Sequence, residues 1–83
     1  MIKVRFFASF REKLDCEQLT LEEGEYASSL FALKRQLAEN GEDWREVMMS
    51  DRTLVAINQN MTRQDVVLHC GDEVAFFPPV TGG

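Results

Sequence analysis

The first eight residues, MIKVRFFA (residues 1–8), alternate between two sets of side chains and so predict a β-strand. A period of two is typical of a strand that packs one face against a core and leaves the other free. The first face carries Ile2, Val4 and Phe6, and the second carries Lys3, Arg5 and Phe7. The chain therefore begins with a strand whose first face we expect to be buried.

The following residues predict a second strand and then a helix. EQLTLE (residues 17–22) alternates through its two leucines, and the short polar link before it suggests a β-hairpin. From Tyr26 to Asn40 the apolar period changes to that of an amphipathic helix. Ser28 or Ser29 would cap its start, and Asn40-Gly41 would provide a left-handed stop.

The second half of the chain adds shorter elements. We expect a helical turn over residues 43–49, a strand over 53–58 followed by a turn at 58–60, and a short extended piece over 66–68. A tight turn at Gly71-Asp72 then leads into the last strand, residues 73–77. The order of strands around one main helix predicts an α+β roll, in which a mixed sheet wraps over that helix.

Length and charge limit what such a chain can do. Its 83 residues suffice for one domain, which we place at residues 1–77, with a C-terminal tail at 78–83. The net charge of −5 and the absence of a basic run argue against nucleic acid as a partner. No apolar run approaches the roughly 18 residues that a membrane span requires, and no signal peptide is evident. We therefore expect a cytoplasmic protein.

The residue types most often used in catalysis are few. Cys16 and Cys70 have no metal-binding spacing, so we expect two free thiols and no metal site. His69 and Cys70 are adjacent on an extended segment, where neighbouring side chains point to opposite faces. They are thus a poor nucleophile–base pair.

The most informative segment is the tail, FFPPVTGG (residues 76–83). Pro78 has no N–H and ends the strand, and the Pro78-Pro79 pair directs the chain away from the sheet. Gly82 and Gly83 have no Cβ, so their backbone fits a channel too narrow for side chains. We expect the tail to be mobile from Val80 onward until a partner binds it. The terminal carboxylate is a poor electrophile unless another enzyme activates it.

Taken together, MIKVRFFA, VAINQ (residues 55–59) and GDEVAFFPPVTGG (residues 71–83) resemble the small subunits of molybdopterin synthase. These are ubiquitin-like sulfur carriers with the β-grasp fold, used in molybdenum cofactor biosynthesis. The resemblance implies that a ubiquitin-activating-like adenylyltransferase uses ATP to adenylate Gly83. It further implies that a sulfur donor protein converts Gly83 to a thiocarboxylate, whose sulfur passes to a cyclic pyranopterin in the large synthase subunit. No cofactor would be bound by this chain.

The strand phases also predict a docking surface. If the first face of residues 1–8 is buried together with Val74 and Phe76, Phe7 and Phe77 point outward. The β-grasp fold implied by the resemblance makes the first and last strands neighbours, so the two rings would form an exposed aromatic patch. The resemblance implies that Met61 and Arg11 border the same surface. Burial of the two rings under the second helical segment is the alternative.

Three other functions share part of these features. A sulfur carrier for thiamin thiazole formation has the same fold and the same Gly-Gly chemistry. A ubiquitin-like modifier would be joined to lysines of other proteins. An interaction module with an inert tail would undergo no chemistry at Gly83.

Overall fold

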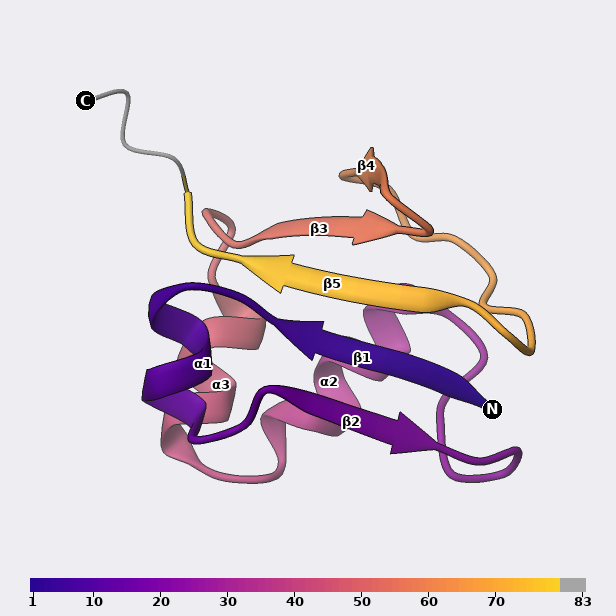
Figure 1. The fold of residues 1–83 in the computed structure, drawn as a ribbon, viewed down its shortest axis with the longest axis horizontal. Coiled ribbons are helices and arrows are strands. Elements are labelled where there is room, and N and C mark those ends of the chain that lie inside the picture. The colour runs from indigo at the N-terminus through magenta and orange to yellow at the C-terminus, as the bar shows by residue number, and fades with distance from the viewer. Residues whose placement is uncertain (80–83) are drawn as a thin grey trace.

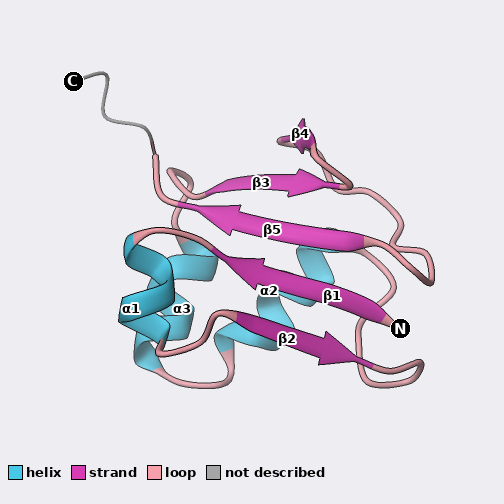
Figure 2. Ribbon diagram, viewed as in Figure 1, coloured by secondary structure: helices cyan, strands magenta, loops and turns pink. Residues whose placement is uncertain are grey.

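A computed structural model of the chain describes residues 1–79. It is an α+β fold in which a five-stranded mixed sheet packs against helices, as the sequence predicts (Figures 1 and 2). The elements, in chain order, are β1 (Ile2–Phe6), α1 (Ser9–Leu14), β2 (Gln18–Leu21), α2 (Leu30–Ala38), α3 (Glu42–Met49), β3 (Leu54–Ile57), β4 (Asn60–Thr62) and β5 (Glu73–Phe77).

The strands lie side by side in the order β2-β1-β5-β3-β4 (Figure 1). The first and last strands are neighbours at the centre of the sheet, where β1 and β5 are parallel and Val4 is opposite Val74. The other neighbouring strands are antiparallel. This arrangement places the C-terminal end of β5 beside that of β1, so Phe7 and Phe77 emerge at the same end of the sheet.

The helices α2 and α3 cover one face of the sheet, behind the strands in Figure 2. The strand phases predicted for β1 and β5 are confirmed, because Phe6 and Phe76 are at most 1% exposed and stack with ring centroids 5.8 Å apart. Trp44 of α3 packs edge-on against Phe6, with the ring centroids 5.3 Å apart. The core consists of buried apolar residues from both layers: Ile2, Val4, Phe6, Leu14, Leu30, Leu33, Leu37, Val47, Met48, Val55, Leu68, Val74 and Phe76.

The link between the first two strands differs from the expected short hairpin. β1 and β2 are antiparallel neighbours, but the link contains the six-residue helix α1. The helix buries Leu14 in the core and ends at Asp15, whose left-handed φ of 50° completes the turn back toward β2. Packing of Leu14 and Phe10 against the core explains a helix for which the sequence contains no capping signal.

The main helix is shorter than the range 26–40 that we predicted. Of the two candidate caps, Ser29 is the N-cap, and its Oγ accepts the N–H of Ala32 at 3.2 Å. The preceding residues are extended because they pair with a distant segment: the N–H of Leu68 donates to Ser28 and that of Leu30 donates to Val66. These bonds form the short extended piece expected near residues 66–68.

The structure corrects one further prediction and refines two others. The left-handed stop at Asn40-Gly41 is wrong, because α2 ends at Glu39 in a right-handed conformation and Gly41 is instead the N-cap of α3. The helical turn expected at 43–49 is the complete helix α3. The turn after β3 is confirmed at Asn58 and Gln59, which both have positive φ, but Asn60 already belongs to β4.

The division into a domain at residues 1–77 and a tail at 78–83 remains a prediction, and the expected mobility from Val80 onward concerns residues outside the described part. Within residues 1–79, no helix is long and apolar enough to cross a lipid bilayer.

Candidate functional site

The candidate site is the outer face of the sheet, which is the face opposite α2 and α3. Strand register determines its members, since residues directly opposite one another share a face. Leu54 is opposite Phe77, and Ala56 lies between Ala75 and Met61. Phe7 continues this face from β1, with its N–H donating to the carbonyl of Phe76 at 3.1 Å.

Phe7 and Phe77 form an aromatic pair at one end of the outer face. Their ring centroids are 5.5 Å apart with the planes tilted by 48°, and both rings are half-buried. They lie on the face opposite Trp44 and α3, so the alternative of burial under the second helical segment is wrong. An aromatic pair that remains partly in water offers apolar area and ring edges to a partner.

Small residues make the floor of the outer face beside this pair. Ala56 and Ala75 are 4% and 8% exposed although no helix covers them, because larger neighbouring side chains shield them. Met61, which is 57% exposed, stands at the far edge of the floor on β4. The face is therefore a shallow apolar surface, with aromatic side chains at one end and a flexible thioether at the other.

Charged groups border this surface on the β1 side. The Arg5 guanidinium lies 5.1 Å from the centroid of the Phe7 ring, within cation–π range, and 3.8 Å from the carboxylate of Glu73. Arg5 thus lies over the face of the Phe7 ring. Leu54 and the two alanines were not predicted as site residues. Neither was Arg5, although its strand phase placed it on the same face as Phe7. The alternation within strands 2–6, 54–57 and 73–77 was the signal for all of them.

The predicted site residue Arg11 lies on α1. It is exposed, and its guanidinium is 3.9 Å from Glu17 at the start of β2. This ion pair directs the Arg11 side chain toward the β2 side of the sheet. The contribution of Arg11 to a surface centred on Phe7 and Phe77 remains a prediction.

The tail begins directly from the outer face. β5 ends at Phe77, and the next residue, Pro78, is half-buried while Pro79 is exposed. The remaining predicted site residues, Val80, Thr81, Gly82 and Gly83, lie outside the described part of the chain. The residues that precede them show that the tail starts next to the aromatic pair.

The thiol and imidazole groups lie elsewhere. Cys16 is half-buried beside β2, and this burial raises the pKa of its thiol. Cys70 is exposed and accepts a hydrogen bond from the Met1 ammonium at 3.1 Å, which raises the pKa of that ammonium. His69 is exposed, with its Nδ1 3.9 Å from Asp72. Within residues 1–79, no three metal-ligating side chains cluster.

The mixed sheet with parallel terminal strands at its centre, the covering helices and the exposed outer face define a ubiquitin-like β-grasp protein. A solved structure that supports this class is the small archaeal modifier protein 1 of Methanosarcina acetivorans. It is 23% identical with a TM-score of 0.78, over 99% of this chain and 95% of that chain.

Residues 4–83 match the ThiS family. Two relatives named molybdopterin synthase sulfur carrier subunit, from Haemophilus influenzae and Escherichia coli, are each 40% identical over 100% of both chains. The structure of a complex of subunits 1 and 2 of molybdopterin-converting factor from Helicobacter pylori contains a similar chain. That chain is 26% identical with a TM-score of 0.67, over 99% of this chain and 97% of that one. The protein belongs to the ThiS family, among the sulfur carrier subunits of molybdopterin synthase.

Proposed function

We propose that this chain carries sulfur on Gly83 as a C-terminal thiocarboxylate and delivers it for formation of the molybdopterin dithiolene. The observation that carries the proposal is the 40% identity, over the whole chain, to proteins named molybdopterin synthase sulfur carrier subunit. The Gly82-Gly83 ending after a Pro-Pro spacer supplies the chemical group that the proposal needs.

The chemistry requires activation because a carboxylate is a poor electrophile. In the first step a carboxylate oxygen of Gly83 attacks the α-phosphorus of ATP and pyrophosphate leaves, which gives an acyl adenylate. Sulfur that the donor supplies at the oxidation level of sulfide then attacks the carbonyl carbon, the bond to the AMP oxygen breaks, and AMP leaves as the thiocarboxylate forms. We assign ATP binding to the ubiquitin-activating-like adenylyltransferase and no bound cofactor to this chain.

The outer face would hold the carrier on the large synthase subunit while the tail reaches the active site. Phe7 and Phe77 are half-buried and adjacent, and Met61 is exposed on the same face. Because β5 continues directly into Pro78, docking at Phe77 fixes the point from which the tail starts. Arg11 would contact the partner from α1.

In this proposal the chain is a non-catalytic subunit. The acid–base groups would belong to the large subunit, which receives the cyclic pyranopterin precursor. The dithiolene contains two sulfur atoms, so two charged carriers or two rounds of charging serve each product molecule, as a heterotetramer of two small and two large subunits would allow. We expect this assembly to work in the cytoplasm.

The test is a reconstitution from purified components. The chain is incubated with the activating enzyme, ATP and a sulfur donor, and then with the large subunit and precursor, and molybdopterin is measured as its fluorescent oxidation product. Product formation is expected only when every component is present. A charged carrier that supplies sulfur to thiazole formation but not to molybdopterin would overturn the proposal, as would conjugation of the chain to lysines without sulfur transfer.

A further inference from the structure

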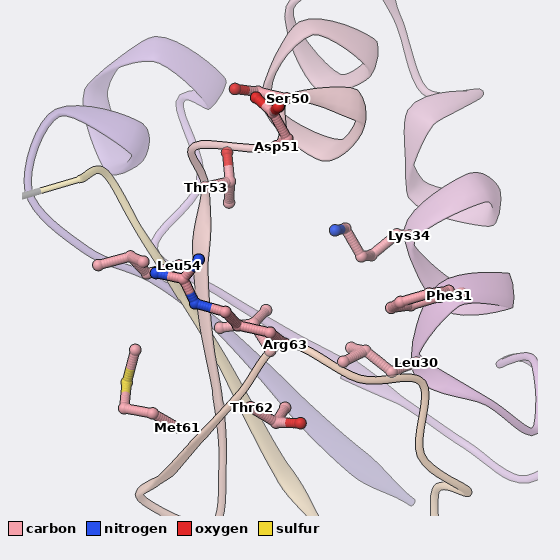
Figure 3. Close-up of a pocket in the computed structure, with 11 residues that line it drawn as sticks. Leu30, Phe31, Lys34, Ser50, Asp51, Thr53, Leu54, Met61, Thr62 and Arg63 are labelled. Atoms are coloured by element: carbon pink, nitrogen blue, oxygen red, sulfur yellow. The ribbon is translucent and has the colours of Figure 1, made fainter.

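A second surface feature lies around the edge of the sheet from the outer face. It is a groove of about 590 Å³ between α2 and the β3–β4 hairpin, called the α2–β4 groove below. In Figure 3, Leu30 and Phe31 line it from α2, and Leu54 and Met61 line it from the hairpin. Phe31 is 38% exposed, an unusual position for a phenylalanine that has no partner to cover it.

The α2–β4 groove is basic on a protein that is strongly acidic. Its lining includes Lys34, Arg63 and one carboxylate, Asp51, whereas the whole chain has a net charge of −5. Figure 3 shows Lys34 pointing from α2 into the groove and Arg63 extending along the opposite side. Neither cation forms an ion pair with another residue in the range 1–79.

The carboxylate in the lining, Asp51, forms no ion pair with these cations within residues 1–79. The Lys34 ammonium lies 5.6 Å from the centroid of the Phe31 ring, which positions the charge above an apolar wall. The carboxylate of Asp65, near the same end of α2, accepts the backbone N–H of Phe31 at 2.8 Å. The groove thus presents two available cations beside exposed apolar carbon.

The groove is continuous with the outer face. Leu54 and Met61 belong to both, because each lies on the outer face by register and also lines the groove. A partner that covers Phe77 and Met61 therefore reaches the mouth of the groove without crossing any polar gap between the two surfaces. Apolar area with charges at its border is the usual composition of a protein–protein interface.

We propose that the α2–β4 groove receives a segment of the large synthase subunit in which an acidic residue neighbours an apolar one. The apolar side chain packs against Phe31 and Met61, and the carboxylate lies between Lys34 and Arg63. This inference rests on the proposed function and adds a second, charge-selective contact to the aromatic docking surface. Such a contact selects a partner by its charge and speeds association.

The experiment compares two double charge reversals in binding to the purified large subunit by isothermal calorimetry at low and high salt. Lys34→Glu with Arg63→Glu changes the groove. Arg35→Glu with Arg45→Glu is the matched control, because it makes the same change in charge at exposed positions on α2 and α3 outside the groove. We expect the groove variant to bind at least about tenfold more weakly and to lose most of the salt dependence, with the control close to wild type.

Four other results would overturn the inference. If both double variants lose affinity equally, the effect is one of overall charge. If the groove variant binds as wild type does while Phe77→Asp does not bind, the outer face suffices and the proposed function stands without the groove. If sedimentation shows that wild type self-associates and the groove variant does not, the groove holds a second copy of this chain. Failure of wild-type chain to bind the large subunit would remove both the groove and the proposed function.

A third variant separates the apolar contact from the charges. Phe31→Ala is expected to weaken binding, and the loss of affinity should be the same at low salt and at high salt. The reason is that the substitution removes contact area without altering charge. Urea unfolding of each variant shows whether the fold is retained. A Phe31→Ala chain that is folded and binds as wild type does would contradict the apolar part of the contact.

Discussion

The two faces of the sheet are built from alternate residues of the same strands, yet they have different surroundings. On one face Phe6 and Phe76 are covered by helices and are at most 1% exposed. On the other, Phe7 and Phe77 follow them directly in the sequence and are only half-buried. Folding explains the first pair, because burial of each ring contributes on the order of 2–3 kcal/mol. The second pair is only partly buried on folding and contributes less to stability, so we assign these two rings to the binding of a partner.

Removal of Gly83 should have the largest effect, although it alters neither face. Deletion of this residue is expected to abolish molybdopterin formation, since the penultimate glycine would then end the chain one residue short of the partner's reactive group. The urea midpoint should equal that of wild type. One alanine added after Gly83 is the complementary variant and should be equally inactive. Product formation by either chain would show that sulfur is carried elsewhere.

Truncation of a core ring should affect stability most. Phe76→Ala is expected to lower the free energy of unfolding by about 3–5 kcal/mol, because it leaves a cavity beneath the helices. For a chain of this size that is a large part of a total of roughly 4–12 kcal/mol. Urea denaturation measures it, with Phe77→Ala as the control at the adjoining position. Equal losses for the two variants would remove the distinction between the faces.

A charge on the outer face should affect binding rather than folding. Phe77→Asp is expected to weaken binding to the large subunit by about 2–4 kcal/mol, as for a central aromatic anchor. The control is Val67→Asp, which places the same charge at a 64% exposed apolar position away from this face. Calorimetry with the large subunit measures both. Normal binding by Phe77→Asp, or its failure to fold, would contradict the assignment of the outer face.

The smallest expected effect concerns the helix that covers the core face. Ser29→Ala should cost about 1 kcal/mol of stability, because its Oγ accepts the Ala32 N–H at the start of α2. Ser28→Ala, one residue earlier, should be near neutral because the carbonyl that pairs with Leu68 is retained. Urea midpoints of the two variants provide the test. A larger loss of stability for Ser28→Ala than for Ser29→Ala would contradict the assignment of Ser29 as the N-cap.

The sequence predicted β1, β2, β3 and β5 because each has a strong local signal, but it did not predict β4, whose first residue, Asn60, was assigned to a turn. The alternation in residues 2–6 and 73–77 is complete, and the strand at 73–77 was predicted with its observed bounds. The same alternation assigned Phe7 and Phe77 to the outward faces of their strands, and the β-grasp resemblance made those strands neighbours, as the parallel pairing of β1 and β5 confirms. This part of the candidate site follows from periodicity together with the resemblance.

The rest depends on contacts between distant residues, which a local pattern does not contain. Helix α1 exists because Phe10 and Leu14 pack against the core. The start of α2 is delayed because residues 28–30 form backbone hydrogen bonds with Val66 and Leu68. The α2–β4 groove joins residues 30–34 to residues 54–63, so only the fold could reveal that Lys34 and Arg63 line the same groove.

The central claim is that Gly83 becomes a thiocarboxylate, and intact-mass spectrometry tests it most directly. The purified chain is incubated with the activating enzyme, ATP and a sulfur donor, and fragment masses locate the change. We predict the mass increase of one oxygen exchanged for sulfur, confined to the C-terminal residue, and its disappearance when ATP is omitted. An unchanged mass in the complete reaction, or sulfur found on Cys16 or Cys70, would contradict the account.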